Sequence, residues 1–376
     1  MTNRILVTGG AGFIGSHLID DLLESGHDII VYDILEPQVH GINPEVPEYL
    51  AKDIKFIRDD IKNRSALIEA LNDIDVVIHL AAMVGVGQSM YQIDRYTEVN
   101  TLGTARLLDI LVNEENNVKK IVVASSMSTY GEGAYSCKDC GVFYPGLRSQ
   151  KQLEQGIWEI ICEKCGNIAK PIPTDEHKPQ DCTSIYALTK KEQEKMVLLI
   201  GDTYGINATA LRLFNVYGSR QSLLNPYTGV CAIFSSSLLN NNPPTVYEDG
   251  NQTRDFVHVK DICQGFILSM KNNISKGKVY NVGSGKPITI NDIAKVLCKQ
   301  INPKIKPNIT NKFRFGDVRH CFSDISKISS ELGYSPNYNF EKAIKELVDW
   351  LRFQRGKALD KSSIANKELK DKGLIK

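Results

Sequence analysis

The sequence has little net charge, and it contains no apolar run long enough to cross a membrane. Its 45 Lys and Arg residues nearly balance 44 Asp and Glu residues, which leaves a formal net charge of +1. Nucleic acids and anionic membranes bind strongly basic surfaces, so neither is expected as a partner. A transmembrane helix needs about 20 consecutive apolar residues. The composition therefore favours a soluble enzyme.

The N-terminus carries no secretion signal. Residues 1–4 lead directly into Ile5–Val7, an apolar run typical of a buried strand rather than of a signal peptide. The cytoplasm is therefore the expected compartment. Disulfides are rare in that reducing compartment, and the total of nine cysteines is odd, so disulfides are not expected.

Apolar segments alternate with amphipathic helical segments over the first half of the chain. Strands that are apolar without alternation have both faces covered, which is typical of a parallel, doubly wound α/β sheet. We expect strands at 5–7, 28–32, 76–79, 120–124 and 208–213, and helices at 16–25, 65–71, 98–112 and 184–204. Beyond residue 217 the pattern loosens, which indicates a smaller substrate lobe.

A glycine-rich loop, Thr8–Gly15, follows the first predicted strand and opens the first predicted helix. Its sequence is TGGAGFIG, and such glycines let the backbone approach a pyrophosphate at the helix N-terminus, where the dipole favours anions. Asp33 ends the second strand, where a carboxylate accepts hydrogen bonds from ribose hydroxyls. A carboxylate there repels a 2′-phosphate, so the pattern predicts NAD rather than NADP. The alternative is that Asp33 is an ordinary turn residue at the surface.

Tyr186 and Lys190 lie four residues apart in a predicted helix and therefore share one of its faces. A nearby ammonium and an oxidised nicotinamide would lower the pKa of a tyrosine from about 10 toward working pH. Ser126 ends a predicted strand at the C-terminal edge of the sheet, where ligands bind in open α/β folds. A Tyr-x3-Lys pair alone also occurs by chance, and its combination with Ser126 gives it weight.

Four of the nine cysteines form two C-x2-C units with 21 residues between the units. They are Cys137, Cys140, Cys162 and Cys165. This spacing is typical of a zinc ribbon, in which four thiolates close on one tetrahedral ion. Gly141 and Gly166 follow the two units, and knuckle turns need a residue tolerant of positive φ there. We predict one structural zinc per chain, because four thiolates leave the metal no open position. Iron, two disulfides and chance are the alternatives.

The cysteine segment divides the chain. It breaks the alternation of strands and helices between the strand of Ser126 and the helix of Tyr186, so we expect a zinc-ribbon-like insertion in a Rossmann sheet. The expected parts are a NAD-binding Rossmann domain at 1–132 and 176–216, a four-cysteine insertion at 133–175, a nucleotide-sugar-binding lobe over most of 217–356, and a polar tail at 357–376.

In their order along the chain, these motifs resemble the extended short-chain dehydrogenase/reductase family, in its nucleotide-sugar epimerase/dehydratase branch. The resemblance covers nearly the whole chain and includes motifs at 79–82, 211–218, 250–259 and 314–319. It implies that Tyr186 is the catalytic base and Ser126 the proton-relaying hydroxyl. It also implies that Lys190 lowers the tyrosine pKa and holds the nicotinamide ribose.

The resemblance further implies two binding sites. For NAD it implies contacts from Gly9, Gly12, Phe13, Ile14, Gly15, Asp33, Asp60, Ile61, Leu80, Ala81, Ala82, Asn100, Tyr186 and Lys190. For the substrate it implies Ser126, Asn215, Arg254, Arg314, Asp317 and Arg319. Arg254, with Arg314 or Arg319, would clamp a diphosphate through the fork geometry of arginine. The alternative for these arginines is surface ion pairing.

The residues after Ser126 separate the chemistries of this branch. The 4,6-dehydratases resembling this fold carry an Asp-Glu pair there, whereas this chain carries Met127-Ser128, so dehydration is disfavoured. The resemblance then implies an epimerase that inverts a ring hydroxyl, with C4 expected, by transient oxidation with tightly bound NAD. The rivals are an NAD(P)-dependent nucleotide-sugar reductase, dehydrogenase or decarboxylase of the same fold, and a non-catalytic NAD sensor.

The insertion narrows the range of expected substrates. A four-cysteine insertion at this position is similar to that of some dTDP-L-rhamnose 4-epimerase-like proteins. A nucleoside-diphosphate 6-deoxysugar is therefore the first expectation and UDP-glucose or UDP-galactose the second, and a homodimer is expected. Cys182 stands just before the helix of Tyr186 and is expected to pack, with contact to the sugar as the alternative. The remaining cysteines, Cys231, Cys263, Cys298 and Cys321, are predicted to lie in the core.

Overall fold

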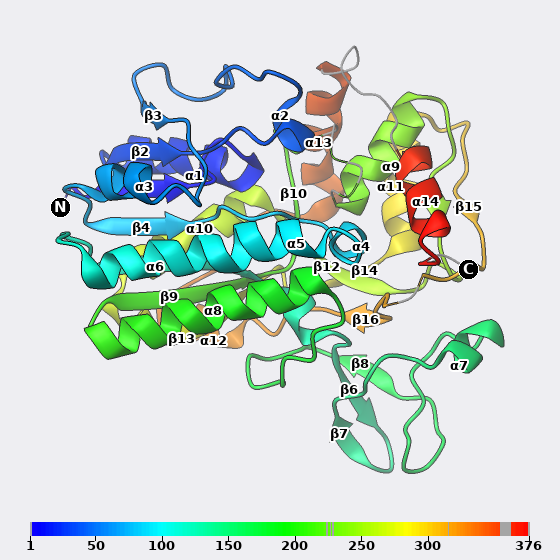
Figure 1. Cartoon of the computed structure of the whole chain (residues 1–376). Helices are drawn as coiled ribbons and strands as arrows, with labels where there is room; N and C mark the ends of the chain where they lie inside the picture. The colour runs from blue at the N-terminus through cyan, green and yellow to red at the C-terminus, as the bar shows by residue number, and fades with distance from the viewer. Residues whose placement is uncertain are drawn as a thin grey trace.

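The computed structural model describes residues 2–222, 225, 227, 229–314, 316–353 and 362–374, the side chains of 362–366 excepted (Figure 1). At its centre lies a parallel sheet with the strand order β13-β9-β5-β4-β1-β2-β3. These strands are β1 (Arg4–Thr8), β2 (Asp28–Tyr32), β3 (Lys55–Ile57), β4 (Val76–His79), β5 (Lys120–Ser126), β9 (Asn207–Leu213) and β13 (Lys278–Val282). The order reverses between β1 and β4, which is where open α/β sheets bind ligands.

Helices cover both faces of this sheet, as the buried strands require. One face carries α1 (Phe13–Glu24) and α10 (Val259–Lys271), and the other carries α3 (Arg64–Leu71), α6 (Gly103–Asn113) and α8 (Ile185–Tyr204) (Figure 1). α8 begins where the Ser184 hydroxyl accepts a hydrogen bond from the N–H of Ala187. It ends at Gly205, whose φ is +77°. The predicted doubly wound fold is confirmed.

The observed elements differ from the predicted ones in three places. The predicted helix at 98–112 starts earlier, with α5 (Ile93–Tyr96) and a π-helical turn (Thr97–Leu102) before α6. β3 was not predicted, because it is short and partly exposed and so lacks an apolar run. β13 was not predicted either, although it pairs with β9 and extends the sheet into the segment assigned mainly to the lobe.

The C-terminal lobe packs three helices against short strands. Its helices are α9 (Val230–Leu239), α11 (Ile290–Ile301) and α13 (Phe340–Phe353). Its strands are β10 (Asn215–Tyr217), β11 (Thr245–Val246), β12 (Thr253–His258), β14 (Pro287–Thr289), β15 (Asn308–Ile309) and β16 (His320–Cys321). Tyr217, Phe234, Leu297, Phe340 and Leu347 belong to a core of its own. Cys231 and Cys298 lie in this core, and Cys263 and Cys321 lie in the core of the sheet, as predicted.

The segment with the four cysteines protrudes below the sheet and the lobe (Figure 1). β6 (Ala134–Cys137) is the middle strand of an antiparallel sheet, with β7 (Gly141–Phe143) and β8 (Lys170–Ile172) on either side. The short helix α7 (Gln150–Glu154) follows β7. The buried cluster of this segment contains Tyr135, Ile160 and Ala169, with Phe143 against it.

The remaining elements connect these parts. They are α2 (Pro37–His40), α4 (Val86–Ser89), α12 (Ser326–Leu332), α14 (Ser362–Asp371) and the 3₁₀ turns Met127–Tyr130 and Asn273–Ser275. α14 belongs to the predicted polar tail, yet its Leu369 is buried and its Glu368 accepts a hydrogen bond from Tyr91 at 2.9 Å. The tail residues 357–361 and 375–376 lie outside the described residues.

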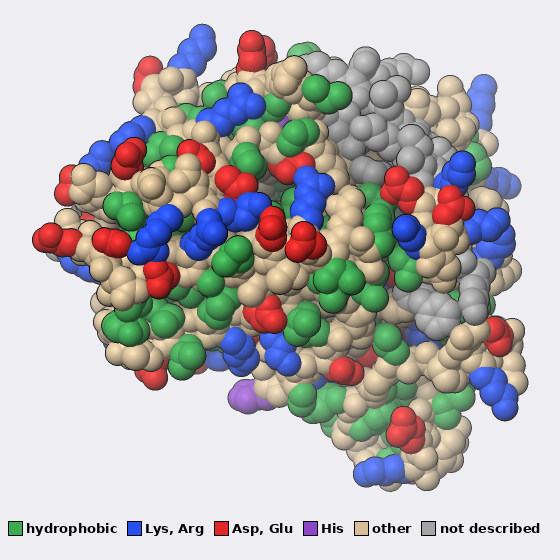
Figure 2. Space-filling model, viewed as in Figure 1, with side chains coloured by type: hydrophobic (Ala, Val, Ile, Leu, Met, Phe, Trp, Pro, Cys, Tyr) green, Lys and Arg blue, Asp and Glu red, His purple; other side chains and the backbone are tan. Residues whose placement is uncertain are grey.

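The surface mixes charges of both signs. On the face in Figure 2, basic and acidic side chains are interspersed over the sheet domain and the lobe. Among the described residues, no helix combines the length and apolar character that a bilayer-spanning segment needs.

Candidate active site and cysteine centre

The predicted catalytic residues meet at the C-terminal edge of the central sheet. β1 leads into the glycine loop, β5 ends at Ser126, and the first turns of α8 carry Tyr186 and Lys190. Burial raises the pKa of Tyr186, and the nearby Ser126 hydroxyl lowers it by less. The Tyr186 backbone N–H donates to Ser89 Oγ at 3.0 Å and fixes the start of the helix.

The glycine loop contains one glycine that packing requires and one that leaves space. A Cβ at Gly15 would lie 2.7 Å from both Gly10 Cα and Gly9 O, so only glycine lets α1 cross the loop. A Cβ at Gly12 would meet Gly9 O at 3.2 Å and no other described atom within 4 Å. The open side of Gly12, at the N-terminus of α1, suits the approach of a pyrophosphate.

Asp33 joins the end of β2 to this loop. Its side chain is buried and accepts hydrogen bonds from the N–H of Ala11 at 3.0 Å and from the N–H of Leu35 at 2.8 Å. Burial raises the pKa of Asp33, and the two backbone donors counter that rise. Asp33 is therefore not a surface turn residue. Each carboxylate oxygen has a second lone pair, which suits the hydroxyls of a ribose.

The other residues predicted for the cofactor lie around the same edge. Leu80 and Ala81 continue β4, and both of their N–H groups donate to Thr8. Asp60 accepts a hydrogen bond from the N–H of Lys62 at 2.9 Å. Asn100 is fully buried, donates to Met83 O at 3.1 Å and Thr189 Oγ1 at 3.0 Å, and accepts from Met83 N at 2.7 Å. Asn100 therefore ties the chain after β4 to α8. Ile61 is also buried and packs against Gly103.

Gln193, which the sequence analysis did not identify, holds the ammonium of Lys190. Lys190 Nζ donates to Gln193 Oε1 at 2.7 Å, and both side chains are buried. Burial lowers the pKa of Lys190 to about 7. Gln193 Nε2 donates to Thr104 Oγ1 at 2.7 Å and lies 3.2 Å from His79 Nε2. These contacts turn the amide oxygen toward the lysine. The available signal was a polar residue three positions after Lys190 on the buried face of α8.

His79 carries this hydrogen-bond chain to the glycine loop. Burial lowers the pKa of His79 to about 3, so its ring is neutral. Its Nε2 lies 2.9 Å from Thr104 Oγ1 and 3.2 Å from Gln193 Nε2, and its Nδ1 shares a hydrogen bond of 2.7 Å with Thr8 Oγ1. Lys190, Gln193, His79 and Thr8 thus form one buried connection from α8 to the end of β1.

A buried ion pair fixes the strand that carries Ser126. Glu194 is fully buried and accepts two hydrogen bonds from Arg212 of β9, at 3.0 and 2.6 Å. It also accepts a hydrogen bond from the Ser125 hydroxyl at 2.7 Å. The pair therefore joins β5, α8 and β9 beside the catalytic residues.

Most of the predicted substrate residues keep polar atoms that could contact a ligand, and Arg319 does not. Asn215 Oδ1 is buried and has no hydrogen-bond partner among the described residues. Arg314 Nε donates to Asp317 Oδ2 at 2.8 Å, and its guanidinium lies 4.7 Å from the ring centroid of Tyr247. The Arg314 side chain is 40% exposed, so it retains donors for a ligand.

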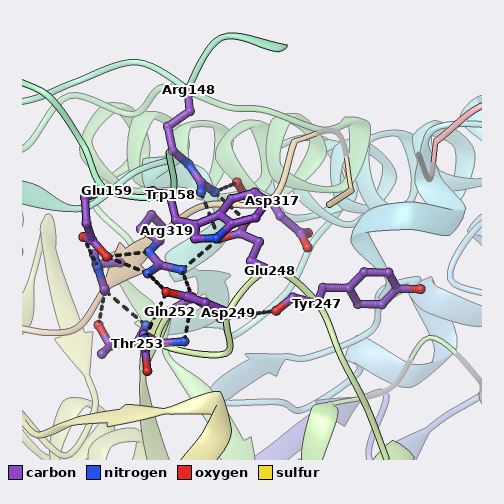
Figure 3. Close-up of polar contacts among 12 residues, drawn as sticks. Arg148, Trp158, Glu159, Tyr247, Glu248, Asp249, Gln252, Thr253, Asp317 and Arg319 are labelled. Atoms are coloured by element: carbon purple, nitrogen blue, oxygen red, sulfur yellow. Dashed lines mark hydrogen bonds and ion pairs between the residues drawn. The ribbon is translucent and has the colours of Figure 1, made fainter. Parts of the chain in front are cut away.

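Arg254 and Arg319 differ in their surroundings. Arg254 donates to the carbonyl groups of Thr253, Val318 and Arg319 at 2.5–3.0 Å. Arg319 is completely buried, and its guanidinium donates to carboxylate oxygens of Glu159, Glu248 and Asp249 (Figure 3). Three carboxylates therefore occupy the Arg319 guanidinium, whereas the Arg314 side chain is partly exposed.

The two C-x2-C units converge, as the spacing predicts. One ligand atom from each of Cys137, Cys140, Cys162 and Cys165 lies within 4.8 Å of the others. Sulfurs around a tetrahedral zinc ion are about 3.8 Å apart, since each Zn–S bond is about 2.3 Å. Gly141 and Gly166 have φ values of +80° and +76°, as predicted for knuckle turns. All nine cysteines are free thiols, so the donor set suits one metal ion. Cys182 is half-buried, 3.7 Å from Thr129 O.

Known proteins resemble this chain along most of its length. The chain is 35% identical to a dTDP-L-rhamnose 4-epimerase of Burkholderia thailandensis, covering 93% of this chain and 94% of that protein. The structure of a Thermotoga maritima UDP-glucose 4-epimerase with UDP-glucose has a TM-score of 0.75 and 29% identity, covering 93% and 99%. That of a Thermus thermophilus UDP-glucose 4-epimerase in complex with NAD has a TM-score of 0.73 and 28% identity, covering 93% and 99%.

Two protein families match consecutive parts of the chain. Residues 5–145 match the NAD dependent epimerase/dehydratase family, and residues 163–347 match the family of GDP-mannose 4,6 dehydratase. These matches and the 35% identity over 93% of the chain agree with the resemblance seen in the motifs. The placement of Ser126, Tyr186 and Lys190 beside the glycine loop agrees with it as well. The chain belongs to the NAD-dependent epimerase/dehydratase family, within the extended short-chain dehydrogenases/reductases.

Proposed function

We propose that this protein is an NAD-dependent nucleotide-sugar epimerase that inverts a ring hydroxyl, with C4 as the expected carbon. The observation that carries the proposal is the meeting of Tyr186, Ser126 and Lys190 at one edge of the sheet. The residues after Ser126 are Met127 and Ser128, and the Ser128 hydroxyl donates to Ser126 Oγ at 2.9 Å. Dehydration would need an acid and a base at that place, so epimerisation is the better fit.

The chain's own groups divide the work of proton transfer. In this proposal Tyr186 takes the proton of the sugar hydroxyl, and Ser126, whose hydroxyl lies near the phenol, relays it. Lys190 in its ammonium form would favour the phenolate, and Gln193 would hold that ammonium in place. The glycine loop and Asp33 would hold NAD, whose bound nicotinamide supplies the transient oxidation of the sugar carbon.

The substrate is proposed to be a dTDP- or UDP-linked hexose or 6-deoxyhexose. Arg254 and Arg314 would contact the diphosphate, and the buried amide of Asn215 would bind beside them. Arg319 was also a candidate for the diphosphate. Its guanidinium already donates hydrogen bonds to three carboxylates, so we propose instead that it joins the insertion to the lobe. The B. thailandensis relative supports a dTDP-6-deoxysugar first.

The cysteine centre is proposed to hold one structural zinc ion. Four thiol groups within 4.8 Å of one another can complete a tetrahedral shell with no position left for a substrate. Elemental analysis of protein purified without chelator should give one zinc per chain. Iron in its place, or no metal, would contradict this part of the proposal. A homodimer and a cytoplasmic location complete the proposal and need sedimentation and fractionation measurements.

The reaction is tested by incubating the protein with dTDP-, UDP- and GDP-sugars and recording proton NMR spectra of the products. A product inverted at one ring carbon is expected from at least one dTDP- or UDP-sugar. When the reaction runs in D2O, that carbon should carry no deuterium, because transient oxidation returns the same hydrogen. Deuterium at the inverted carbon, or a dehydrated product, would overturn the proposed function.

A further inference from the structure

The insertion meets the lobe through buried charges. Arg148 stands between β7 and α7, and its guanidinium donates to both carboxylate oxygens of Glu248 at 2.9 Å (Figure 3). The two side chains are 1% and 3% exposed. Such a two-fold contact fixes orientation as well as distance, because both groups are planar forks. Glu248 follows β11, so this pair joins the insertion to the lobe.

A second arginine completes the same cluster from the lobe side. Arg319 contacts Glu159 of the insertion at 2.5 Å, Glu248 at 2.9 Å and Asp249 at 2.7 Å. We call Arg148, Glu159, Glu248, Asp249 and Arg319 the insertion–lobe cluster. Two guanidinium groups here face three carboxylates, and most of these groups are buried, so the geometry of each depends on the others.

His320 adds a further hydrogen bond to this cluster. Its Nδ1 accepts from the N–H of Thr253 at 3.1 Å, so its Nε2 carries the proton and donates to Glu159 at 3.1 Å. The hydrogen bond from His320, followed by that from Arg319, outweighs burial and lowers the pKa of Glu159 to about 2. Glu159 is therefore ionised at any working pH.

Apolar packing does not close the seam between α7 and the lobe. A hollow of about 710 Å³ lies there, and its lining includes Trp158 and Lys312. These two residues also touch the charge cluster, because Trp158 O accepts from Arg148 at 3.0 Å and Lys312 O accepts from Glu248 N at 2.7 Å. Charged and polar contacts thus border this hollow on the side of the cluster.

The cluster leads directly to the residues proposed to hold the diphosphate. Arg148 Nη2 donates to Asp317 O at 3.0 Å, and the carboxylate of Asp317 pairs with Arg314 at 2.8 Å. Glu248, the partner of Arg148, adjoins Tyr247, whose ring lies under the guanidinium of Arg314. One insertion side chain therefore contacts both segments that orient Arg314.

The second proposed clamp residue depends on the same stretch of backbone. Arg254 donates to Val318 O at 2.5 Å and to Arg319 O at 3.0 Å. These carbonyl groups directly follow the Asp317 carbonyl that Arg148 holds. A shift of residues 317–319 would consequently move Arg254 and Arg314 together.

We propose that Arg148 is a positioning residue for the substrate diphosphate, and that through it the insertion sets how tightly the lobe binds a nucleoside diphosphate. This inference rests on the proposed function, in which Arg254 and Arg314 contact the diphosphate. Arg148 itself touches no ligand in this scheme. Its contribution is the orientation of two other arginines.

The test compares full-length Arg148→Met with Lys151→Met, which removes an exposed lysine from α7 of the same insertion. Calorimetry measures the Kd for dTDP, UDP and GDP, and turnover assays measure KM and kcat. For Arg148→Met we expect the Kd and KM to rise between about 10- and 100-fold, because small displacements of positioning groups cost that much. The kcat at saturation and the NAD content should stay near those of Lys151→Met.

Two further variants separate positioning from general damage. In an Arg314→Met background, Arg148→Met should add a smaller loss than it causes in the wild type, because only its effect through Arg254 remains. Arg148→Lys keeps the positive charge but cannot form the two parallel hydrogen bonds to Glu248. Its affinity for the nucleoside diphosphate should therefore lie between those of Arg148→Met and the wild type. If Arg148→Met does not fold, Glu248→Gln, which keeps the shape and weakens the same contact, should raise the Kd by a smaller factor.

The outcomes also distinguish this inference from the proposed function. Wild-type protein that binds none of the three nucleoside diphosphates would refute the diphosphate site and the inference together. Wild-type binding with an unchanged Kd in Arg148→Met, or losses that multiply in the double variant, would refute the inference alone. A fall in kcat and stability with an unchanged KM would likewise refute positioning and indicate a purely structural residue.

Discussion

β5 and β6 follow one another along the chain, but different interactions order them. Every one of the seven residues of β5 is buried between β4 and β9. Burial of each Val or Ile in such a strand stabilises the fold by about 1.5–3 kcal/mol. β6 lies in a sheet of short strands whose buried cluster contains Tyr135, Ile160 and Ala169. A structural zinc site supplies about 10–16 kcal/mol in small peptides, so the cysteines would dominate the order of the insertion.

This difference assigns the two regions different parts of the function. The groups proposed for proton transfer lie on β5 and α8, which the buried pair of Glu194 and Arg212 joins to β9. The groups proposed for the diphosphate touch the backbone at 317–319, which the insertion holds through Arg148. Changes in the sheet should therefore alter the chemical step, whereas changes in the insertion should alter substrate binding.

The largest effect is expected in the sheet, from Tyr186→Phe. The variant removes the proposed base but leaves the glycine loop and Asp33 intact. Removal of a general base costs about 10²- to 10⁴-fold, so kcat should fall by about 10³-fold. Bound NAD, measured after denaturation of the purified variant, should match the wild type. A variant that keeps kcat within tenfold would remove Tyr186 from the mechanism.

A smaller and different effect is expected from Cys137→Ser combined with Cys140→Ser in the insertion. Two lost thiolates should release the metal, and hydrogen exchange should then quicken in residues 133–175 but not in β1, β4 or β5. The KM for the sugar nucleotide should rise about tenfold with little change in kcat. Loss of residues that orient a binding group, without touching the ligand themselves, typically has an effect of this size. Cys231→Ser is the matched control, since that thiol lies in the core of the lobe and is not one of the four converging cysteines. Equal exchange rates in the insertion of variant and wild type would contradict metal-dependent order.

The same contrast explains how far the sequence alone could lead. The boundaries of β2 and β4 and the places of Ser126, Tyr186 and Lys190 were predicted correctly, because apolar runs and motifs of fixed spacing determine them locally. Convergence of the four cysteines followed from spacing in the same way. Apart from the 21-residue gap between the two cysteine units, these features depend on neighbours within a few residues.

The features that were missed depend on contacts between distant residues. Arg148 and Glu248 are 100 positions apart, and nothing near either one marks it as a partner of the other. Arg319 lies in the same short motif as Arg314, and only the folded chain distinguishes the buried arginine from the half-exposed one. The role of Gln193 was not predicted, because a single glutamine in a helix forms no recognisable motif. Its role follows only from its contacts with Lys190 and His79 in the folded chain.

The smallest effect is expected in the sheet again, from Gln193→Leu. Leucine cannot accept the hydrogen bond of the Lys190 ammonium, and a bond to a charged group is worth about 1.5–3 kcal/mol. The pKa of Lys190, which burial already lowers to about 7, should therefore fall by about one unit or more. Lysine is cationic below its pKa, so the cation would be lost at a lower pH than in the wild type. For a fall of one unit, activity should decline about fivefold near pH 7 and about twofold near pH 6.

Gln193→Glu gives the opposite sign and serves as the matched control. Glutamate keeps an acceptor oxygen and adds a negative charge beside Lys190, which favours the ammonium and raises its pKa. The alkaline limb of kcat against pH should consequently move to higher pH in Gln193→Glu and to lower pH in Gln193→Leu. His79, which lies near Lys190, stays neutral in both variants. Limbs that coincide in the two variants would show that Gln193 does not control the charge of Lys190.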